Sequence, residues 1–99
     1  MHIISRKQLR EFGEQYPDAA TPLNEWFRIV KRARWEKPDQ VKAQFGSASF
    51  IGGTVTVFNI AGNKYRLAVN IRYDRGRVYI MHVFTHRQYD EWNAERRGR

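Results

Sequence analysis

A ten-residue segment in which apolar and polar side chains alternate, residues 64–73, constrains the fold of this chain more than any other feature. The apolar side chains occupy every second position: Tyr65, Leu67, Val69, Ile71 and Tyr73. A period of two is typical of a β-strand with one face buried against a core. The other positions hold three cations and no carboxylate, and no Asp or Glu occurs between residues 40 and 73. The basic face is consistent with a surface that binds a polyanion. It is equally consistent with a solvated edge strand whose charges prevent pairing with other chains.

Two flanking segments predict further strands beside this one. Residues 54–60 and 77–84 are rich in the β-branched and aromatic side chains that strands favour. Glycine-containing segments at 62–63 and 74–76 join them to the central strand and have the composition of tight hairpin turns. Three successive strands with short turns predict an antiparallel meander.

The length of the second turn predicts which side chains lie opposite each other. A three-residue loop at 74–76 pairs Val69 with Met81 and sets His82 beside Arg66 on the basic face. A slip of one residue would mix the apolar and basic faces, which would expose apolar area. We therefore expect His82 and Arg66 to be neighbours.

The register of the first hairpin depends on the length of its loop. A two-residue loop at 62–63 places Asn59 opposite Arg66, whereas a three-residue loop places Phe58 there. The sequence leaves both registers open.

Helical periodicity precedes and follows the strands. A capping box at Ser5 and Gln8 predicts a first helix that ends at Pro17, and Thr21–Pro22 has the pattern that opens a second. A short helix is expected after Lys37–Pro38, and residues 2–4 form a short strand or an extended lead-in.

A second capping box predicts the start of the last helix. Thr85 and Gln88 have the required spacing, and residues 95–99 read as a frayed basic tail. The order of elements predicts one α+β domain over residues 1–99. In it, N-terminal helices pack on a three-stranded or slightly larger antiparallel sheet, the other face stays open, and a C-terminal helix follows.

The charge balance predicts an anionic partner. The chain carries a formal net charge of +8 and has a pI near 10.3, so we expect nucleic acid first and an acidic protein second. It has no cysteine, no apolar run of membrane-spanning length, and no signal-peptide core at residues 1–6. These features predict a cytoplasmic protein with no membrane association.

Four side chains with catalytic chemistry are expected at one edge of the sheet: Arg66, His82, His86 and Tyr89. A histidine can move protons near neutral pH, and an arginine can hold a phosphate and stabilise the charge that builds on it. Tyrosine can donate a hydrogen bond or stack on a base. These groups are sufficient to cleave RNA without a metal, although residues 86–89 also fit an ordinary first helical turn.

Sequence motifs for other chemistries are missing. The chain has no HExxH, no CxxC pair, no glycine-rich phosphate loop and no paired carboxylates. We therefore expect neither a metal nor a cofactor.

Four stretches of the chain resemble the HigB toxins of bacterial type II toxin–antitoxin systems, which belong to the RelE-like superfamily. They are MHIIS at residues 1–5, KP at 37–38, VFNIAGNKYRL at 57–67 and THRQYD at 85–90. The resemblance covers nearly the whole chain and implies an endoribonuclease that cleaves mRNA on the translating ribosome. It also implies neutralisation by a HigA-type helix-turn-helix antitoxin, and binding to operator DNA only through the complex of the two proteins.

The resemblance also suggests roles for single residues. Arg66 matches the strand arginine that RelE-like enzymes use on the phosphate, while His86 and Tyr89 match acid–base and orienting positions. RelE-type sites have a lysine pair for which this chain offers only Lys64, so the general base is His86, His82 or Lys64. Further RNA contacts are expected from five polar or basic residues: Asn59, Asn63, Lys64, Arg72 and Arg87.

Two functions without catalysis compete with this interpretation. From Pro38 onward the predicted α-β-β-β-α order resembles a double-stranded-RNA-binding domain, which would bind RNA and leave it intact. Alternatively, the chain is a regulator that binds only protein, and its basic face serves only to hold an acidic protein partner.

Overall fold

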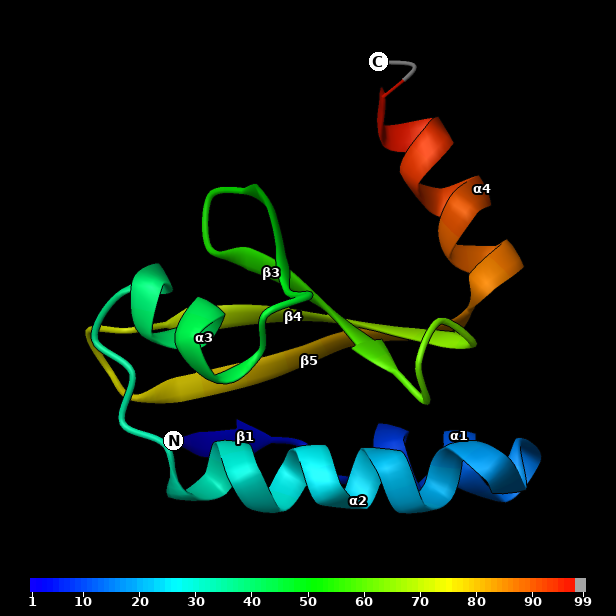
Figure 1. Ribbon diagram of the computed structural model, residues 1–99, viewed down its shortest axis with the longest axis horizontal. Coiled ribbons are helices and arrows are strands. Elements are labelled where there is room, and N and C mark those ends of the chain that lie inside the picture. Colours follow the sequence, from blue (N-terminus) through cyan, green and yellow to red (C-terminus); the bar gives the residue numbers. More distant parts are fainter. Residues whose placement is uncertain (98–99) are drawn as a thin grey trace.

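The computed structural model describes residues 1–97 of the chain as a five-stranded sheet with helices on both faces (Figure 1). The elements in chain order are β1 (His2–Ile4), α1 (Lys7–Gln15), α2 (Pro17–Arg32), α3 (Pro38–Gln44), β2 (Ser49–Gly52), β3 (Val55–Ile60), β4 (Tyr65–Arg72), β5 (Arg77–Thr85) and α4 (His86–Arg97). The α+β class and the antiparallel meander, formed by β3, β4 and β5, are therefore confirmed.

The sheet extends beyond the meander on both sides, in the order β1-β5-β4-β3-β2. Strand β2 pairs with β3 in antiparallel fashion, and β1 pairs with β5 in parallel. Four strands thus separate α3 from α4, so the three-strand outline of a double-stranded-RNA-binding domain is not present.

The main core lies between one face of the sheet and the helices α1, α2 and α3. Phe58 of β3 is 1% exposed and lies at its centre, with its ring 5.4 Å from Trp26 and 5.0 Å from Phe45. Trp35 stacks on Phe58 as well, at 6.3 Å and 20° between planes. Trp26 and Trp35 are therefore core residues, which the sequence alone did not decide.

The second face of the sheet is only partly open, whereas the sequence predicted a fully open face. Helix α4 rises from the end of β5 on the side away from α1 and α2 (Figure 1). It covers a smaller apolar cluster in which Val57, Ala68 and Phe84 are buried against Tyr89 and Trp92. This apolar patch interrupts the basic face, and its removal from water stabilises the packing of α4 on the sheet.

The helix boundaries correct two predictions. Ser5 is not a cap: α1 has Arg6 at its N-cap position and no side-chain hydrogen bond there. Helix α2 begins at Pro17 and runs through Pro22. Proline suits the first helical position because it lacks a backbone N–H, and an N–H at that position would have no intrahelical acceptor. Pro22 removes one backbone hydrogen bond from α2. The helix tolerates this loss because its buried side chains Leu23, Trp26 and Val30 stabilise it through tertiary packing.

The structure decides the register of the first hairpin, and the register of the second agrees with prediction only from Tyr65 to Ala68. Asn59 pairs with Arg66, as a two-residue loop requires, and Ala68 pairs with His82. A β-bulge between Ala68 and Val69 then shifts the pairing by one residue, so Val69 faces Ile80 and not Met81. The predicted register is therefore wrong beyond the bulge.

The last helix begins as predicted. The backbone N–H of Thr85 donates to Gln88 Oε1 at 2.9 Å, and the N–H of Gln88 donates to Thr85 Oγ1 at 3.2 Å. The helix then continues to Arg97, so the predicted frayed tail is wrong up to that residue, and residues 98–99 lie outside the described part of the chain.

Candidate functional site

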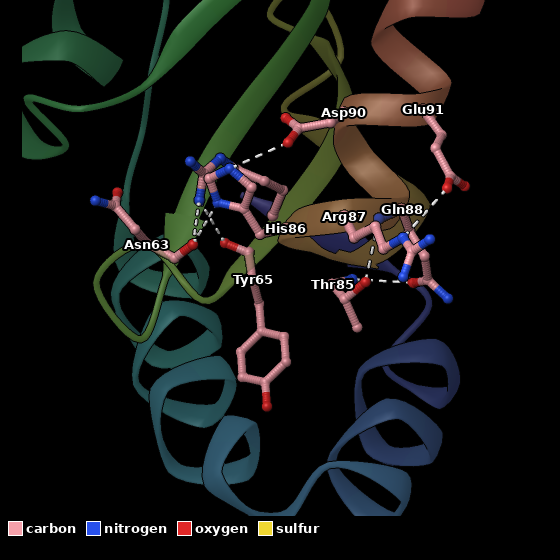
Figure 2. Close-up of polar contacts among 9 residues, drawn as sticks. Asn63, Tyr65, Thr85, His86, Arg87, Gln88, Asp90 and Glu91 are labelled. Atoms are coloured by element: carbon pink, nitrogen blue, oxygen red, sulfur yellow. Dashed lines mark hydrogen bonds and ion pairs between the residues drawn. The ribbon is translucent and has the colours of Figure 1, made fainter.

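The candidate site forms where the turn between β3 and β4 meets the junction of β5 and α4 (Figure 2). The turn spans residues 61–64, with positive φ angles at Ala61 (53°) and Gly62 (68°). The backbone N–H of His86 donates to Lys64 O at 2.9 Å, which ties the first residue of α4 to this turn. Two segments more than twenty residues apart are therefore fixed beside each other.

The backbone carbonyl of Asn63 is the point on which the site converges. It lies 2.9 Å from Nδ1 of His86 and accepts a hydrogen bond of 3.1 Å from a terminal guanidinium nitrogen of Arg66. Since a carbonyl oxygen only accepts, Nδ1 of His86 must carry a proton. Nε2 is then the nitrogen of this ring that is left for proton exchange.

Asp90 faces Nε2 of His86 from one helical turn further along α4. Its carboxylate oxygen lies 3.3 Å from Nε2, and the side chain of His86 is 51% exposed (Figure 2). Both ring nitrogens thus face acceptors, and only the doubly protonated ring can donate to both. The surroundings of His86 are suited to a proton donor that solvent or a ligand can reach.

Arg66 extends from β4 across the second face of the sheet. The nitrogen that bonds to Asn63 also donates to the carbonyl of Tyr65 at 3.2 Å, and the guanidinium carbon lies 5.7 Å from the ring centre of Tyr89. In the described part of the chain, its other guanidinium nitrogens make no hydrogen bond. Arg66 is therefore held in place and can still donate to an anion.

Aromatic rings form one wall of the site. Tyr89 packs 6.0 Å from both Phe84 and Trp92, and the exposed ring of His82 lies 5.2 Å from Phe84. Arg96 covers Trp92 with its guanidinium 5.0 Å from the ring centre. The predicted group of Arg66, His86 and Tyr89 is thus brought together. The ring of His82 contacts the aromatic wall, at Phe84 and Trp92.

The residues predicted to contact RNA are distributed unevenly. Asn59 lies within the site and donates to Asn63 Oδ1 at 3.4 Å. Arg87 is on the outer side of α4, paired with Glu91 at 3.6 Å (Figure 2). Lys64 turns to the opposite side of the sheet and pairs with Asp18 at 2.7 Å.

Arg72 is not part of this cluster. It pairs with Asp74 at 3.4 Å and stands six residues along β4 from Arg66, about 20 Å away at the usual rise of a strand.

Sequence reasoning missed the contributions of four residues. The role of Asn63 is carried by its backbone carbonyl, which no side-chain pattern reveals. The contacts of Phe84 and Trp92 depend on α4 covering the second face. Asp90 was detectable, because it follows His86 by four residues and therefore shares its helical face.

No group of three or more His, Cys, Asp or Glu side chains within residues 1–97 is arranged to hold a metal ion. No helix in the same range is both long and apolar enough to cross a membrane.

Comparison with known proteins decides the family. Residues 19–92 match the family model described as HigB_toxin, the RelE-like toxic component of a toxin–antitoxin system. The chain belongs to the HigB toxin family. It is 31% identical to the mRNA interferase toxin HigB of Escherichia coli strain K12, over 98% of this chain and 95% of that protein. It is 26% identical to an mRNA interferase HigB of Escherichia coli O6:H1, over 92% and 90% of the two chains.

The candidate site lies within the region that the HigB family model matches. The matched region contains all of β3, β4 and β5 and the first half of α4, and so includes Arg66, His86 and Tyr89. The protein is therefore the toxin component of a toxin–antitoxin system, as the resemblance implied.

Proposed function

We propose that this HigB-family toxin is an endoribonuclease that cleaves mRNA through its own side chains, with Arg66, His86 and Tyr89 at the reacting phosphate. The observation that carries the proposal is the convergence of Arg66 and His86 on the carbonyl of Asn63. It sets a guanidinium and an imidazole side by side, which supports their use as phosphate ligand and proton donor. Relatives that cover nearly the whole chain are named mRNA interferases, which supports the same activity.

The reaction uses the nucleophile that RNA itself provides. The ribose 2′-oxygen attacks the adjacent phosphorus, the bond from phosphorus to the 5′-oxygen breaks, and a 2′,3′-cyclic phosphate and a 5′-hydroxyl result. Arg66 binds the phosphate and stabilises the charge that develops on it. His86 gives the proton of Nε2 to the leaving 5′-oxygen, and Tyr89 orients the phosphate or an adjacent base.

The proton of the attacking 2′-hydroxyl needs an acceptor, and we assign that role to His82. The register places His82 opposite Ala68, two residues from Arg66 on the same face of β4, and its ring is exposed. Lys64, the other candidate, is drawn away by its ion pair with Asp18. Asn59, Asn63 and Arg87 are the proposed contacts to the rest of the RNA.

The partners follow from the charge and the family. We propose that a HigA-type antitoxin neutralises the toxin, that their complex binds operator DNA through the antitoxin, and that cleavage takes place on cytoplasmic ribosomes. A net charge of +8 suits both ribosomal RNA and an acidic segment of an antitoxin.

The test is induction of the wild-type chain in bacterial cells that lack any antitoxin, with the 5′ ends of transcripts mapped. We expect growth arrest with new 5′-hydroxyl ends, and loss of both with Arg66→Ala. Arg10→Ala on α1 is the matched control, because it removes the same charge from a surface away from the site. Arrest with intact transcripts would refute cleavage and indicate an RNA-binding module, and full toxicity of Arg66→Ala would refute the assigned site.

A further inference from the structure

A carboxylate on α2 is connected to the candidate site through the turn between β3 and β4. Asp18 lies in the first helical turn of α2, on the opposite side of the sheet from α4. Its two carboxylate oxygens bind two consecutive residues: Oδ2 lies 2.7 Å from Lys64 Nζ, and Oδ1 accepts the Tyr65 hydroxyl at 2.5 Å. We call these three residues the Asp18 anchor.

Packing in the core holds one member of the Asp18 anchor, Tyr65, in place. The ring of Tyr65 is buried, 7% exposed, with Phe12 at 5.3 Å edge-on and Tyr16 at 5.6 Å. It points away from His86 and toward the N-terminal helices (Figure 2). Asp18 is thus fixed by a side chain that has little freedom, and it in turn orders the flexible chain of Lys64. The hydrogen bonds from Lys64 and Tyr65 also hold the pKa of Asp18 below its ordinary value.

The turn has few bonds of its own. Across it, the N–H of Lys64 meets the carbonyl of Ala61 at 3.3 Å, near the limit for a hydrogen bond. Ala61 has a positive φ, a conformation that costs energy for a residue with a β-carbon. Contacts from outside must therefore keep this turn in place, and the Asp18 anchor supplies them on one side while His86 and Arg66 supply them on the other.

We propose that Asp18 is a positioning residue for the candidate site, acting through Lys64 to fix the Asn63 carbonyl that aligns His86 and Arg66. The proposal rests on the proposed ribonuclease function for its catalytic consequence. Both carboxylate and ammonium are largely exposed, at 47% and 66% of their side chains, so the ion pair adds little to stability. Its value is geometric, because displacement of a catalytic group by about 1 Å costs about 100-fold in rate.

The ring nitrogens of His86 give a readout that does not require activity. We would record histidine ring ¹⁵N correlation spectra of the wild type, Asp18→Asn and Lys64→Gln, with His2 and His82 as internal references. Asp74→Asn is the matched control, since Asp74 also forms an exposed ion pair next to a hairpin turn, but at the other end of the sheet. We expect the first two variants to shift the Nδ1 signal of His86 and the control to leave it unchanged.

Kinetics on an RNA found cut in the induction experiment give the second readout. Asp18→Asn and Lys64→Gln should each lower kcat about 10-fold to 100-fold with KM nearly unchanged, and the double variant should lose no more than one of them alone. An unmoved His86 signal in both variants would overturn the proposal. The proposal would also be overturned if Lys64→Gln raised KM and if the double variant lost more activity than either single variant, because Lys64 would then contact RNA directly. Failure of the wild type to cleave RNA would refute the proposed function only, since the spectra still decide the anchor.

Discussion

Replacing His86 by alanine separates a proton-transfer role from a structural one. The ring makes one hydrogen bond to the Asn63 carbonyl and one exposed contact with Asp90, so its loss should lower the free energy of unfolding by about 0.5–1.5 kcal/mol. A domain of this size has about 5–15 kcal/mol available, and the variant should stay folded at 25 °C. Proton transfer by a placed side chain contributes about 10²–10⁴ in rate, which corresponds to about 3–5 kcal/mol of transition-state stabilisation. The loss of cleavage should therefore exceed the loss of stability.

The assay is single-turnover cleavage of an end-labelled RNA, run beside a denaturant melt of each variant. Gln88→Ala is the control for movement of α4, because it removes the bond to the Thr85 N–H but keeps the backbone bond from residue 88 to Thr85 Oγ1. It should destabilise by about 1 kcal/mol and lower the cleavage rate far less than His86→Ala does. If Gln88→Ala slows cleavage as much as His86→Ala does, the effect comes from movement of α4. If His86→Ala keeps more than a tenth of the wild-type rate, His86 is not the proton donor.

Three further predictions follow from single contacts. Tyr65, whose hydrogen bond to Asp18 raises its pKa to about 12, should titrate nearer 10 in Asp18→Asn when followed by phenolate absorbance. Since the shift favours the protonated folded state, its contribution to stability is complete below about pH 10 and is lost as the pH rises through 12. Phe58→Ala should cost about 3–5 kcal/mol in a denaturant melt, whereas Phe50→Ala, at a site 42% exposed, should change stability by less than about 0.5 kcal/mol. Arg66→Lys keeps the charge but loses the planar fork, so kcat should fall about 100-fold while the affinity for a 2′-O-methyl RNA, which cannot react, changes little.

Alternation and glycine placement were enough to predict the centre of the sheet. The period of two runs through β4, and Gly62 and Gly76 both adopt the positive φ that turns require. These signals are local in the sequence, so they do not depend on tertiary contacts with the rest of the protein. The parallel pairing of β1 with β5 is different, because it joins the N-terminal segment to a strand that is distant in the sequence and leaves no local pattern.

The β-bulge shows where local reasoning ends. No glycine or proline lies at the bulge itself, at residues 68–69 or opposite them at 80–82, so the local composition does not distinguish it from a regular strand. Its effect is to place Met81 in the second apolar cluster, while His82 packs against Phe84 and Trp92. The position of His82 on the strand was predicted correctly, because the predicted register is right as far as the bulge. Its aromatic neighbours were not predicted.

Lys64 shows how a correct pattern can assign a side chain to the wrong face. Alternation groups Lys64 with Arg66, yet β4 begins at Tyr65, so Lys64 belongs to the turn and is free of the strand's alternation. Asp18 then decides its direction. That carboxylate lies 46 positions away in the sequence, in a segment where the proline pattern had placed a break between helices. The error about the helix boundary and the error about Lys64 therefore have one origin.

The position of His86 depends on restraints that all exist before any RNA binds. The capping box fixes the start of α4 relative to β5, the N–H of His86 is bonded to Lys64 O, and its ring is bonded to the carbonyl of Asn63. Each restraint comes from the backbone or from a neighbour in the chain, and none needs a substrate group. A site ordered in this way has little reorganisation left to do when a phosphate arrives, which is the condition under which electrostatic and proton-transfer catalysis are most effective. It follows that changes in the 61–64 turn that keep the Asn63 side chain should slow the chemical step more than they weaken RNA binding.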